Sequence, residues 1–180
     1  MPGASPADLD QMPDRLLSSR AAAGDRGAFT ILVRRSLPSL RGFLRRLGAP
    51  PDLADDLAQD ALVAAFERIG DYRGDGAFVA WVRRIAARRY LRAVQARMRL
   101  APLEAAPEPF SPAPDTGRSL DLDAALERLS PVQRLCVTLQ HGAGYTSAEI
   151  SQATGLPEGS VKSHISRGLS RLRQDLGSDR

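Results

Sequence analysis

The chain has 180 residues, of which 43% are hydrophobic and 5% aromatic, and its formal net charge at neutral pH is +4. This length allows one domain or two small ones, and the basic balance favours an anionic partner such as a nucleic acid. A lone cysteine, Cys136, excludes an internal disulfide and fits a reducing compartment, so we expect a cytoplasmic protein. No run of about 18 apolar residues and no secretion-signal pattern is present, so we expect no membrane insertion.

The N-terminal segment begins without a helical pattern. Residues 1–13 contain three prolines and no helical period, which predicts a disordered lead. A short helix is predicted from Arg15 to Ala23. A long amphipathic helix follows, because apolar residues recur at three- and four-residue steps from Ala28 to Leu47, and Pro38 is expected to kink it. Asp52 is expected to cap the next helix.

Charge is sorted along the next two predicted helices. Residues 52–75 hold seven acidic residues and two arginines, a net charge of −5. Residues 83–99 hold seven arginines and no acidic residue, a net charge of +7. A basic helix can neutralise phosphates, whereas an acidic helix is repelled by them and needs another partner. The acidic face is therefore either a solvated surface, the commoner case for an isolated helix, or a docking face for a basic partner.

A glycine-rich loop joins these two helices. Residues 70–76 contain three glycines, and Tyr72 within this loop is expected to be exposed. It is either a packing residue or a platform for an unstacked base. In the basic helix, Arg84, Arg88, Arg92 and Arg99 fall near a common edge. So many like charges on one helix favour a phosphate partner over a merely soluble helix.

A proline-rich segment divides the chain. Residues 100–118 contain five prolines, which predicts an extended, flexible linker. Ordinary connections have about 4–6 residues, so this length predicts two separately placed domains, at 14–99 and 119–177. The expected fold class is therefore all-α, with two small helical domains joined by a Pro-rich linker.

The second domain carries the pattern of a helix-turn-helix. Capping boxes are predicted at Ser130–Gln133 and Thr146–Glu149, and Gly155 is expected to end the short helix that the second box starts. A longer basic helix is predicted from Ser160 to Leu176. A short capped helix, a glycine turn and a basic helix predict a helix-turn-helix at 146–167, whose last helix enters the major groove of DNA.

Catalytic and metal sites are not expected. His141 and His164 are the only histidines, and with a single cysteine they do not provide a zinc site. No phosphate-binding glycine loop and no nucleophile elbow is present. Cys136 falls in an apolar stripe and is expected to be an inert core residue. We therefore predict a protein that is not an enzyme and has no cofactor.

Together the two halves resemble the extracytoplasmic-function (ECF) group of the bacterial RNA polymerase sigma-70 family. The matching segments are 56–60, 78–86 and 125–176, and the sharpest match is GSVKSHISRGLSRL at 159–172. The resemblance covers residues 26–176. It implies an alternative sigma factor that binds the polymerase core and directs promoter-specific initiation. Residues 14–99 would act as region 2 and 119–177 as region 4.

The resemblance also implies three sets of site residues and the partners they would contact. An acidic face would bind the polymerase core, on the clamp of its largest subunit, through Asp56, Gln59, Asp60 and Val63. The −10 element would be bound, and its melting assisted, by Tyr72, Trp81, Arg84, Arg88, Arg89 and Arg92. The −35 element would be read by Ser160, Lys162, Ser163, His164, Arg167 and Arg171. Further expected partners are the polymerase flap and an anti-sigma factor.

The sequence departs from the family pattern at one place. Where the family commonly has asparagine, aspartate and arginine, this chain has Arg88, Arg92 and Gln95, which leaves its −10 preference undefined. Two alternatives stay open at this point: a sigma mimic that sequesters an anti-sigma factor, and a simple helix-turn-helix regulator. A mimic needs no basic promoter helix, and a simple regulator needs neither the acidic face nor the helix around Trp81.

Overall fold

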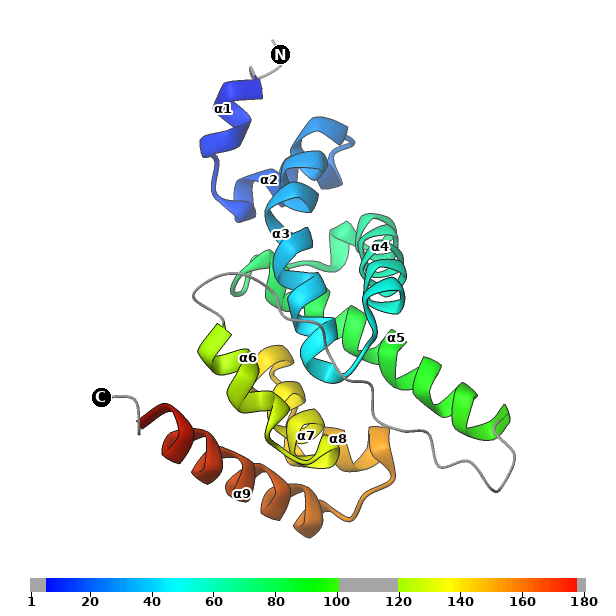
Figure 1. The fold of residues 1–180 in the computed structure, drawn as a ribbon. Helices are drawn as coiled ribbons and strands as arrows, with labels where there is room; N and C mark the ends of the chain where they lie inside the picture. Colours follow the sequence, from blue (N-terminus) through cyan, green and yellow to red (C-terminus); the bar gives the residue numbers. More distant parts are fainter. Residues whose placement is uncertain (1–5, 101–119, 178–180) are drawn as a thin grey trace.

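The computed structural model describes residues 6–100 and 120–177, and within these ranges it contains helices and no strands (Figure 1). The N-terminal part comprises α1 (Pro6–Gln11), α2 (Asp14–Ala22), α3 (Arg26–Leu47), α4 (Pro51–Glu67), the 3-10 turn η1 (Ile69–Asp71) and α5 (Phe78–Leu100). The C-terminal part comprises α6 (Leu120–Glu127), α7 (Pro131–Ala143), α8 (Ser147–Thr154) and α9 (Glu158–Gly177). The all-α prediction is confirmed. The predicted linker, 100–118, lies outside the described residues except for Leu100.

Helix α3 is the centre of the N-terminal part. It packs against α2, α4 and α5, and it buries Leu32, Leu40 and Phe43. The helix starts where the Asp25 carboxylate accepts a hydrogen bond from the backbone N–H of Ala28 (3.1 Å), and it continues through Pro38, where a kink was expected. It ends at a left-handed glycine, and the amphipathic period of the sequence is thus confirmed as one long helix.

The N-terminal lead differs from the expectation. A disordered segment was expected over 1–13, but residues 6–11 form α1, and Leu9 is buried in the core. The guanidinium of Arg35 donates to the backbone carbonyls of Asp10 (2.6 Å) and Met12 (2.8 Å). Arg34 also pairs with the Asp10 carboxylate, so one apolar side chain and two distant arginines hold this short helix, and none of them produces a periodic pattern in the sequence.

Helix α4 begins two residues earlier than expected. Asp52 was expected at the N-cap, but Pro50 occupies that position and Pro51 is the first helical residue, with no side-chain cap. Proline suits this position because its missing N–H would be unpaired there and its fixed φ is already helical. Asp52 lies in the first turn, where its charge favours the helix dipole.

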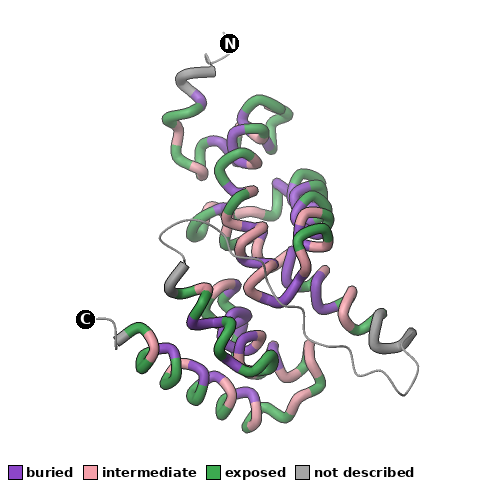
Figure 2. Tube along the Cα trace, in the orientation of Figure 1, coloured by how far each residue is buried: buried purple, intermediate pink, exposed green. Residues whose placement is uncertain are grey.

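The two parts of the chain share one hydrophobic core. Buried residues of α7, α8 and α9, among them Cys136, Ile150 and Val161, belong to the same cluster as those of α2–α5. Figure 2 shows buried segments on the sides where α3 and α5 meet the C-terminal helices. The sequence predicted separately placed domains, whereas the two described parts, 6–100 and 120–177, pack against each other directly through contacts of α3 and α5 with α7.

Glycine makes part of this contact possible. Gly142 lies inside α7, and a Cβ at this position would come within 2.8 Å of the Phe43 ring of α3. Real Cβ atoms do not approach a ring carbon so closely, so a larger residue would push α7 away from α3. Gly142 does not end α7, because the helix continues to Ala143 and Gly144 ends it in the left-handed conformation.

The C-terminal part has the predicted local structure. Both capping boxes are present: Ser130 caps α7 with Gln133, and Thr146 caps α8 with Glu149. Gly155 is left-handed (φ 77°) and ends α8. Helix α9 then begins at Glu158, slightly before the expected Ser160. The helix-turn-helix predicted from capping and glycine chemistry is therefore confirmed as α8, a turn and α9.

Candidate polymerase and promoter interfaces

The outer face of α4 is acidic, exposed and partly apolar. Asp56, Gln59, Asp60 and Val63 are all exposed on this face, and 59% of the Val63 surface is accessible. Because each of these residues lies three or four positions from two of the others, they form one continuous surface. A charged face with an accessible aliphatic side chain at one end is suited to binding a protein with a basic surface.

Phe66 extends this face, which the sequence pattern did not indicate. The apolar period of α4, from Leu53 on, places Phe66 on the inner stripe, but 44% of its surface is exposed and its ring packs edge-to-face with Phe29, with ring centroids 4.9 Å apart. Phe66 lies three residues after Val63, so it continues the same surface by one turn. The sequence does not determine whether a residue at the border of an apolar helical stripe is buried or exposed. Here the contact with Phe29 leaves Phe66 partly exposed.

The loop after α4 is built on an aromatic cluster. Tyr72 was expected to be exposed, but it is half-buried against Phe78 and Trp81, with ring centroids 5.5 and 5.6 Å away. Its hydroxyl donates to the carbonyl of Gly76 (2.6 Å). Burial, and then the charges of Asp14 and Asp75, raise the pKa of Tyr72, so the phenol stays protonated. Packing is therefore one role of Tyr72.

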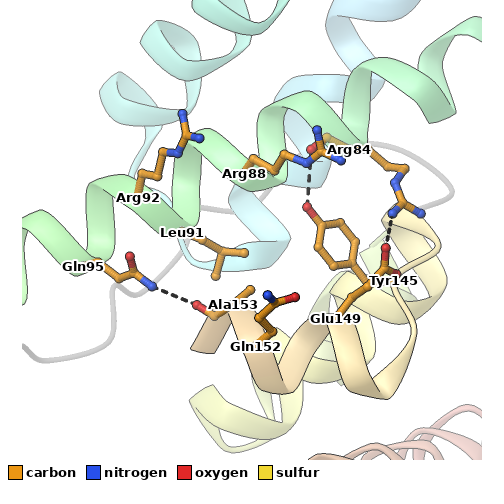
Figure 3. Close-up of a pocket in the computed structure, with 9 residues that line it drawn as sticks. All are labelled: Arg84, Arg88, Leu91, Arg92, Gln95, Tyr145, Glu149, Gln152 and Ala153. Atoms are coloured by element: carbon orange, nitrogen blue, oxygen red, sulfur yellow. Dashed lines mark hydrogen bonds and ion pairs between the residues drawn. The ribbon is translucent and has the colours of Figure 1, made fainter. Parts of the chain in front are cut away.

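The arginines of α5 divide between two sides of the helix. Arg84, Arg88 and Arg92 line one cavity, which confirms that they share an edge (Figure 3). Arg89 points the other way, towards α4, where it lies 3.5 Å from the Asp60 carboxylate. This exposed pair therefore links the acidic face of α4 to the basic helix, and Arg89 does not belong to the row formed by the other three.

Arg83 has a third environment. It is half-buried, its guanidinium lies 5.7 Å from the Phe43 ring centre, and it donates to the Ser39 hydroxyl and to the carbonyl of Gly142 (3.4 Å). Burial, and then the neighbouring charge of Arg46, lower the pKa of Arg83. This arginine therefore belongs to the packing between the two parts of the chain.

The arginine row faces the C-terminal part across a cavity of about 310 Å³ (Figure 3). Arg84 donates to the Glu149 carboxylate (2.5 Å) and to the carbonyl of Gly144 (2.9 Å). Its guanidinium also stacks over the Tyr145 ring, 4.9 Å from the ring centre. Sequence reasoning did not identify Tyr145 or Glu149 as neighbours of this helix, because nothing local in the sequence marks a contact across some sixty positions.

The Glu149 carboxylate is held in two ways at once. Its second oxygen accepts a hydrogen bond from the backbone N–H of Thr146 (2.8 Å), which closes the capping box of α8. This bond first, and the contact with Arg84 after it, lower the pKa of Glu149. The acid is therefore ionised at neutral pH while it faces the arginine row.

Helix α9 presents an accessible polar face. Lys162, Ser163, Arg167 and Arg171 are exposed, while Ser160 and His164 are half-buried. Lys162 pairs with Glu158 one turn earlier (2.7 Å), and Arg167 donates to the carbonyl of Ser163 (3.2 Å). The six residues expected at the −35 element thus all fall on the first four turns of one helix.

The remaining features to consider are the cysteine, a metal site and a membrane-spanning helix. Cys136 is buried, and burial raises the pKa of its thiol, which agrees with an inert core residue. In the described part of the chain, no three histidine, cysteine or carboxylate side chains gather in a way that could hold a metal ion. No described helix combines the length and the apolar composition that crossing a bilayer requires.

Comparison with known proteins identifies the class to which this arrangement belongs. The family model described as "Sigma-70 region 2" matches residues 32–100, and "Sigma-70, region 4" matches residues 119–172. These are the parts that contain the acidic and basic helices and the helix-turn-helix. The fold and its two charged parts are therefore those of a sigma-70 family subunit of bacterial RNA polymerase.

Similar proteins narrow the class. The ECF RNA polymerase sigma factor SigM of Mycobacterium tuberculosis is 33% identical over 167 residues, covering 91% of this chain and 85% of the relative. The RNA polymerase sigma factor CarQ of Myxococcus xanthus is 33% identical over 164 residues, covering 86% and 92%. The chain belongs to the ECF sigma factors. It is an alternative sigma factor that directs transcription initiation.

Solved structures agree with this assignment. CnrH in complex with the cytosolic domain of CnrY is 25% identical with a TM-score of 0.52, covering 93% of this chain and 99% of that one. The sigma factor RpoE in complex with the anti-sigma factor NepR, from Bartonella quintana, is 27% identical with a TM-score of 0.51, covering 82% and 96%.

Proposed function

We propose that this sigma factor divides its work among three helix faces. The outer face of α4 binds the polymerase core, the arginine row of α5 binds the −10 element, and the exposed face of α9 reads the −35 element. The observation that carries the proposal is the separation of charge: an exposed acidic face on α4, and arginine-rich faces on α5 and α9.

Polymerase binding is assigned to Asp56, Gln59, Asp60 and Val63, with Phe66 added. A face of this sign is repelled by DNA and therefore has to meet a basic protein surface, for which the clamp of the largest polymerase subunit is the proposed partner. The exposed Val63 and Phe66 side chains supply apolar area that would be buried in the complex.

Binding of the −10 element is assigned to Arg84, Arg88 and Arg92, with Trp81 and Tyr72 beside them. Arginines one turn apart can follow a phosphate backbone, and their guanidinium forks match phosphate oxygens. A flipped base needs an aromatic surface to replace its lost stacking, and the cluster of Tyr72, Phe78 and Trp81 offers one. Arg89 is assigned the lesser role of orienting α4 through Asp60.

Recognition of the −35 element is assigned to α9. Small serine side chains at positions 160 and 163 allow close approach to base edges, and Arg167 is placed to bond a guanine. Lys162 and Arg171 flank them and are assigned to phosphates. His164, which is half-buried, is assigned a supporting contact only.

An anti-sigma factor is the proposed further partner, acting on this chain in the cytoplasm. Support comes from the two solved neighbours, one of which is described as a complex with an anti-sigma factor and the other as a complex with a cytosolic domain. The residues that such a partner would contact are not assigned.

Transcription reconstituted from purified components tests the proposal. Core polymerase, this protein and fragments of the source genome should give transcripts with defined 5′ ends, and the same core without the protein should not. A double variant with Asp56→Arg and Asp60→Arg should abolish these transcripts. Initiation by the double variant that is as strong as with the unchanged protein would contradict the assignment of α4.

A further inference from the structure

The first turn of α2 packs against the loop that joins α4 to α5. Helix α2 contacts η1, and the side chain of Arg15 lies against Gly74 in the loop. A Cβ at position 74 would come within 3.1 Å of the Arg15 Cγ and within 3.6 Å of its Nε. Gly74 also has a left-handed backbone (φ 79°), so glycine permits both the turn and the close approach of this arginine.

The start of α2 is held in place from α3. The Arg35 guanidinium donates to the Asp14 carboxylate (2.9 Å) and to the carbonyl of Met12 (2.8 Å), and both groups lie at the beginning of the helix. Leu17, within the first turn, is fully buried in the core. Arg15 therefore extends towards the loop from a backbone that is fixed by hydrogen bonds and packing on either side of it.

The charged end of Arg15 is available for a ligand. Arg15 is exposed, and no hydrogen bond or ion pair joins its guanidinium to another described residue. Arg68, at the start of the same loop, differs because it pairs with the Asp71 carboxylate (2.8 Å). The aliphatic stem of Arg15 is thus used in packing against Gly74, whereas the N–H donors of its guanidinium are not used.

The charges around Tyr72 indicate why a nucleotide bound here needs a cation. After burial, the charges of Asp14 and Asp75 raise the pKa of Tyr72, so both carboxylates act on the aromatic cluster. They would repel the phosphate of a nucleotide that stacks on this cluster. Asp14 is paired with Arg35, but no ion pair from a described residue reaches Asp75. A guanidinium beside Gly74 offsets this repulsion and matches phosphate oxygens.

We propose that Arg15 is a further promoter-binding residue: its guanidinium binds the phosphate next to the base that stacks on Tyr72 and Trp81, while its stem supports Gly74. The inference rests on the proposed role of this aromatic cluster at the −10 element. The segment that matches sigma-70 region 2 is 32–100, so Arg15 lies before it and the match assigns this residue no role.

Substitutions at Arg15 separate its charge from its packing. Arg15→Met keeps an unbranched stem against Gly74 without the charge, Arg15→Lys keeps both, and Arg15→Ala keeps neither. With holoenzyme on a promoter located by the transcripts described above, Arg15→Met should weaken binding by about three- to tenfold. The slope of log affinity against log salt concentration should fall by about one phosphate contact. Arg15→Lys should retain most of the affinity. Arg26→Met, at an exposed arginine of α3, is the matched control.

DNA with single uncharged linkages identifies the contact itself. Methylphosphonates replace the phosphates of each strand one at a time across the −10 element of the same promoter. With the unchanged protein, one such linkage beside the flipped base should weaken binding by about three- to tenfold. With Arg15→Met, the same linkage should cause no further loss, because a side chain and a phosphate that contact each other directly do not contribute additively.

Each outcome decides for or against the contact. Unchanged affinity in Arg15→Met, or losses that add at every methylphosphonate position, would overturn it. A loss in Arg15→Lys as large as in Arg15→Met would also overturn it, because a phosphate contact depends on the charge. A loss in Arg15→Ala with none in Arg15→Met would leave only packing against Gly74, which again contradicts the proposal.

Failure of this inference can be told from failure of the proposed −10 role. Arg88→Ala with Arg92→Ala removes two arginines of α5 that are assigned to the same element. If this double variant weakens promoter binding and Arg15→Met does not, only the role of Arg15 is wrong. If neither weakens binding, the proposed −10 role of the N-terminal part is wrong, and the inference about Arg15 is overturned with it.

Discussion

Helices α4 and α5 are neighbours that both carry a dense row of like charge, yet their outer faces differ in one decisive respect. The acidic row of α4 is exposed, with Asp56 and Val63 accessible. In the arginine row of α5, Arg84 is instead bonded to Glu149 of α8, whereas Arg88 and Arg92 are exposed. The difference shows that a charge pattern indicates what a face can bind, whereas contacts from distant parts of the chain decide whether it is free to do so.

The largest expected effect comes from reversing the charge of the exposed acidic face of α4. Asp56→Arg with Asp60→Arg should weaken binding to core polymerase by at least about a hundredfold, because two like charges would meet the basic partner surface. Fluorescence anisotropy with labelled protein measures it. Glu127→Arg makes a charge reversal on α6 and should have little effect. Unchanged core affinity in the double variant would remove α4 from the polymerase interface.

Removing the two exposed arginines of the α5 row tests the other side of the comparison. Arg88→Ala with Arg92→Ala should weaken promoter binding by about tenfold or more. The slope of log affinity against log salt concentration should fall by the amount that about two phosphate contacts contribute. The measurement is promoter affinity of the holoenzyme across a range of salt concentrations. Arg26→Ala, an exposed arginine at the start of α3, is the control. An unaltered salt slope would mean that these arginines do not contact phosphates.

The recognition helix gives an intermediate effect. Arg167→Ala should cost about 1–3 kcal/mol at one base pair of the −35 element and little at the others, because a side chain bonded to a base edge discriminates only there. Affinities for a set of single base-pair substitutions measure it. An equal loss on every sequence would make Arg167 a phosphate contact.

The loop between α4 and α5 should respond more weakly. Tyr72→Phe removes the hydrogen bond to the Gly76 carbonyl and should lower the free energy of unfolding by about 1 kcal/mol, while the ring contacts with Phe78 and Trp81 remain. Urea unfolding measures the stability, and promoter melting should be unchanged. Reduced melting with unchanged stability would place the hydroxyl against DNA instead.

The smallest expected effect is a pH dependence at the ion pair between Arg84 and Glu149. The folded-state pKa of Glu149 lies below its ordinary value of 4.5, first because of the Thr146 backbone N–H and then because of Arg84. A lowered pKa contributes stability that is present above the unfolded value and lost as the pH falls through the folded one. The difference in thermal stability between wild type and Glu149→Gln should therefore shrink from pH 7 to pH 3. A constant difference would argue against the ionised pair.

Much of the fold could be predicted because its signals are local. Apolar period, capping boxes and glycine turns identify α3, α7, α8 and the start of the recognition helix, since each depends on residues within one or two turns. The acidic and basic rows could be found in the same way. Helix α1 could not, because its stability comes from packing of Leu9 against the core and from the bonds of Arg35, both of which depend on distant parts of the chain.

The site was predictable as a set of residues but not as an arrangement. Sequence reasoning placed Arg89 with Arg84, Arg88 and Arg92, yet the helix turns it towards Asp60. The apolar period of α4 includes Phe66, although packing leaves this side chain partly exposed. The contacts of Arg84 with Tyr145 and Glu149 join two families of helices across the chain, and only the assembled core brings them together.

One measurement tests most directly whether the promoter-binding parts are held together and then separate. Donor and acceptor dyes on Ala96→Cys and Gln152→Cys, both exposed and on opposite sides of the interface, report the distance between α5 and α8. Energy transfer should be high in the free protein, where α5 and α8 are in contact, and nearly absent in the promoter-bound holoenzyme, where elements about 85 Å apart are bound. Equal transfer in the two states would contradict the account.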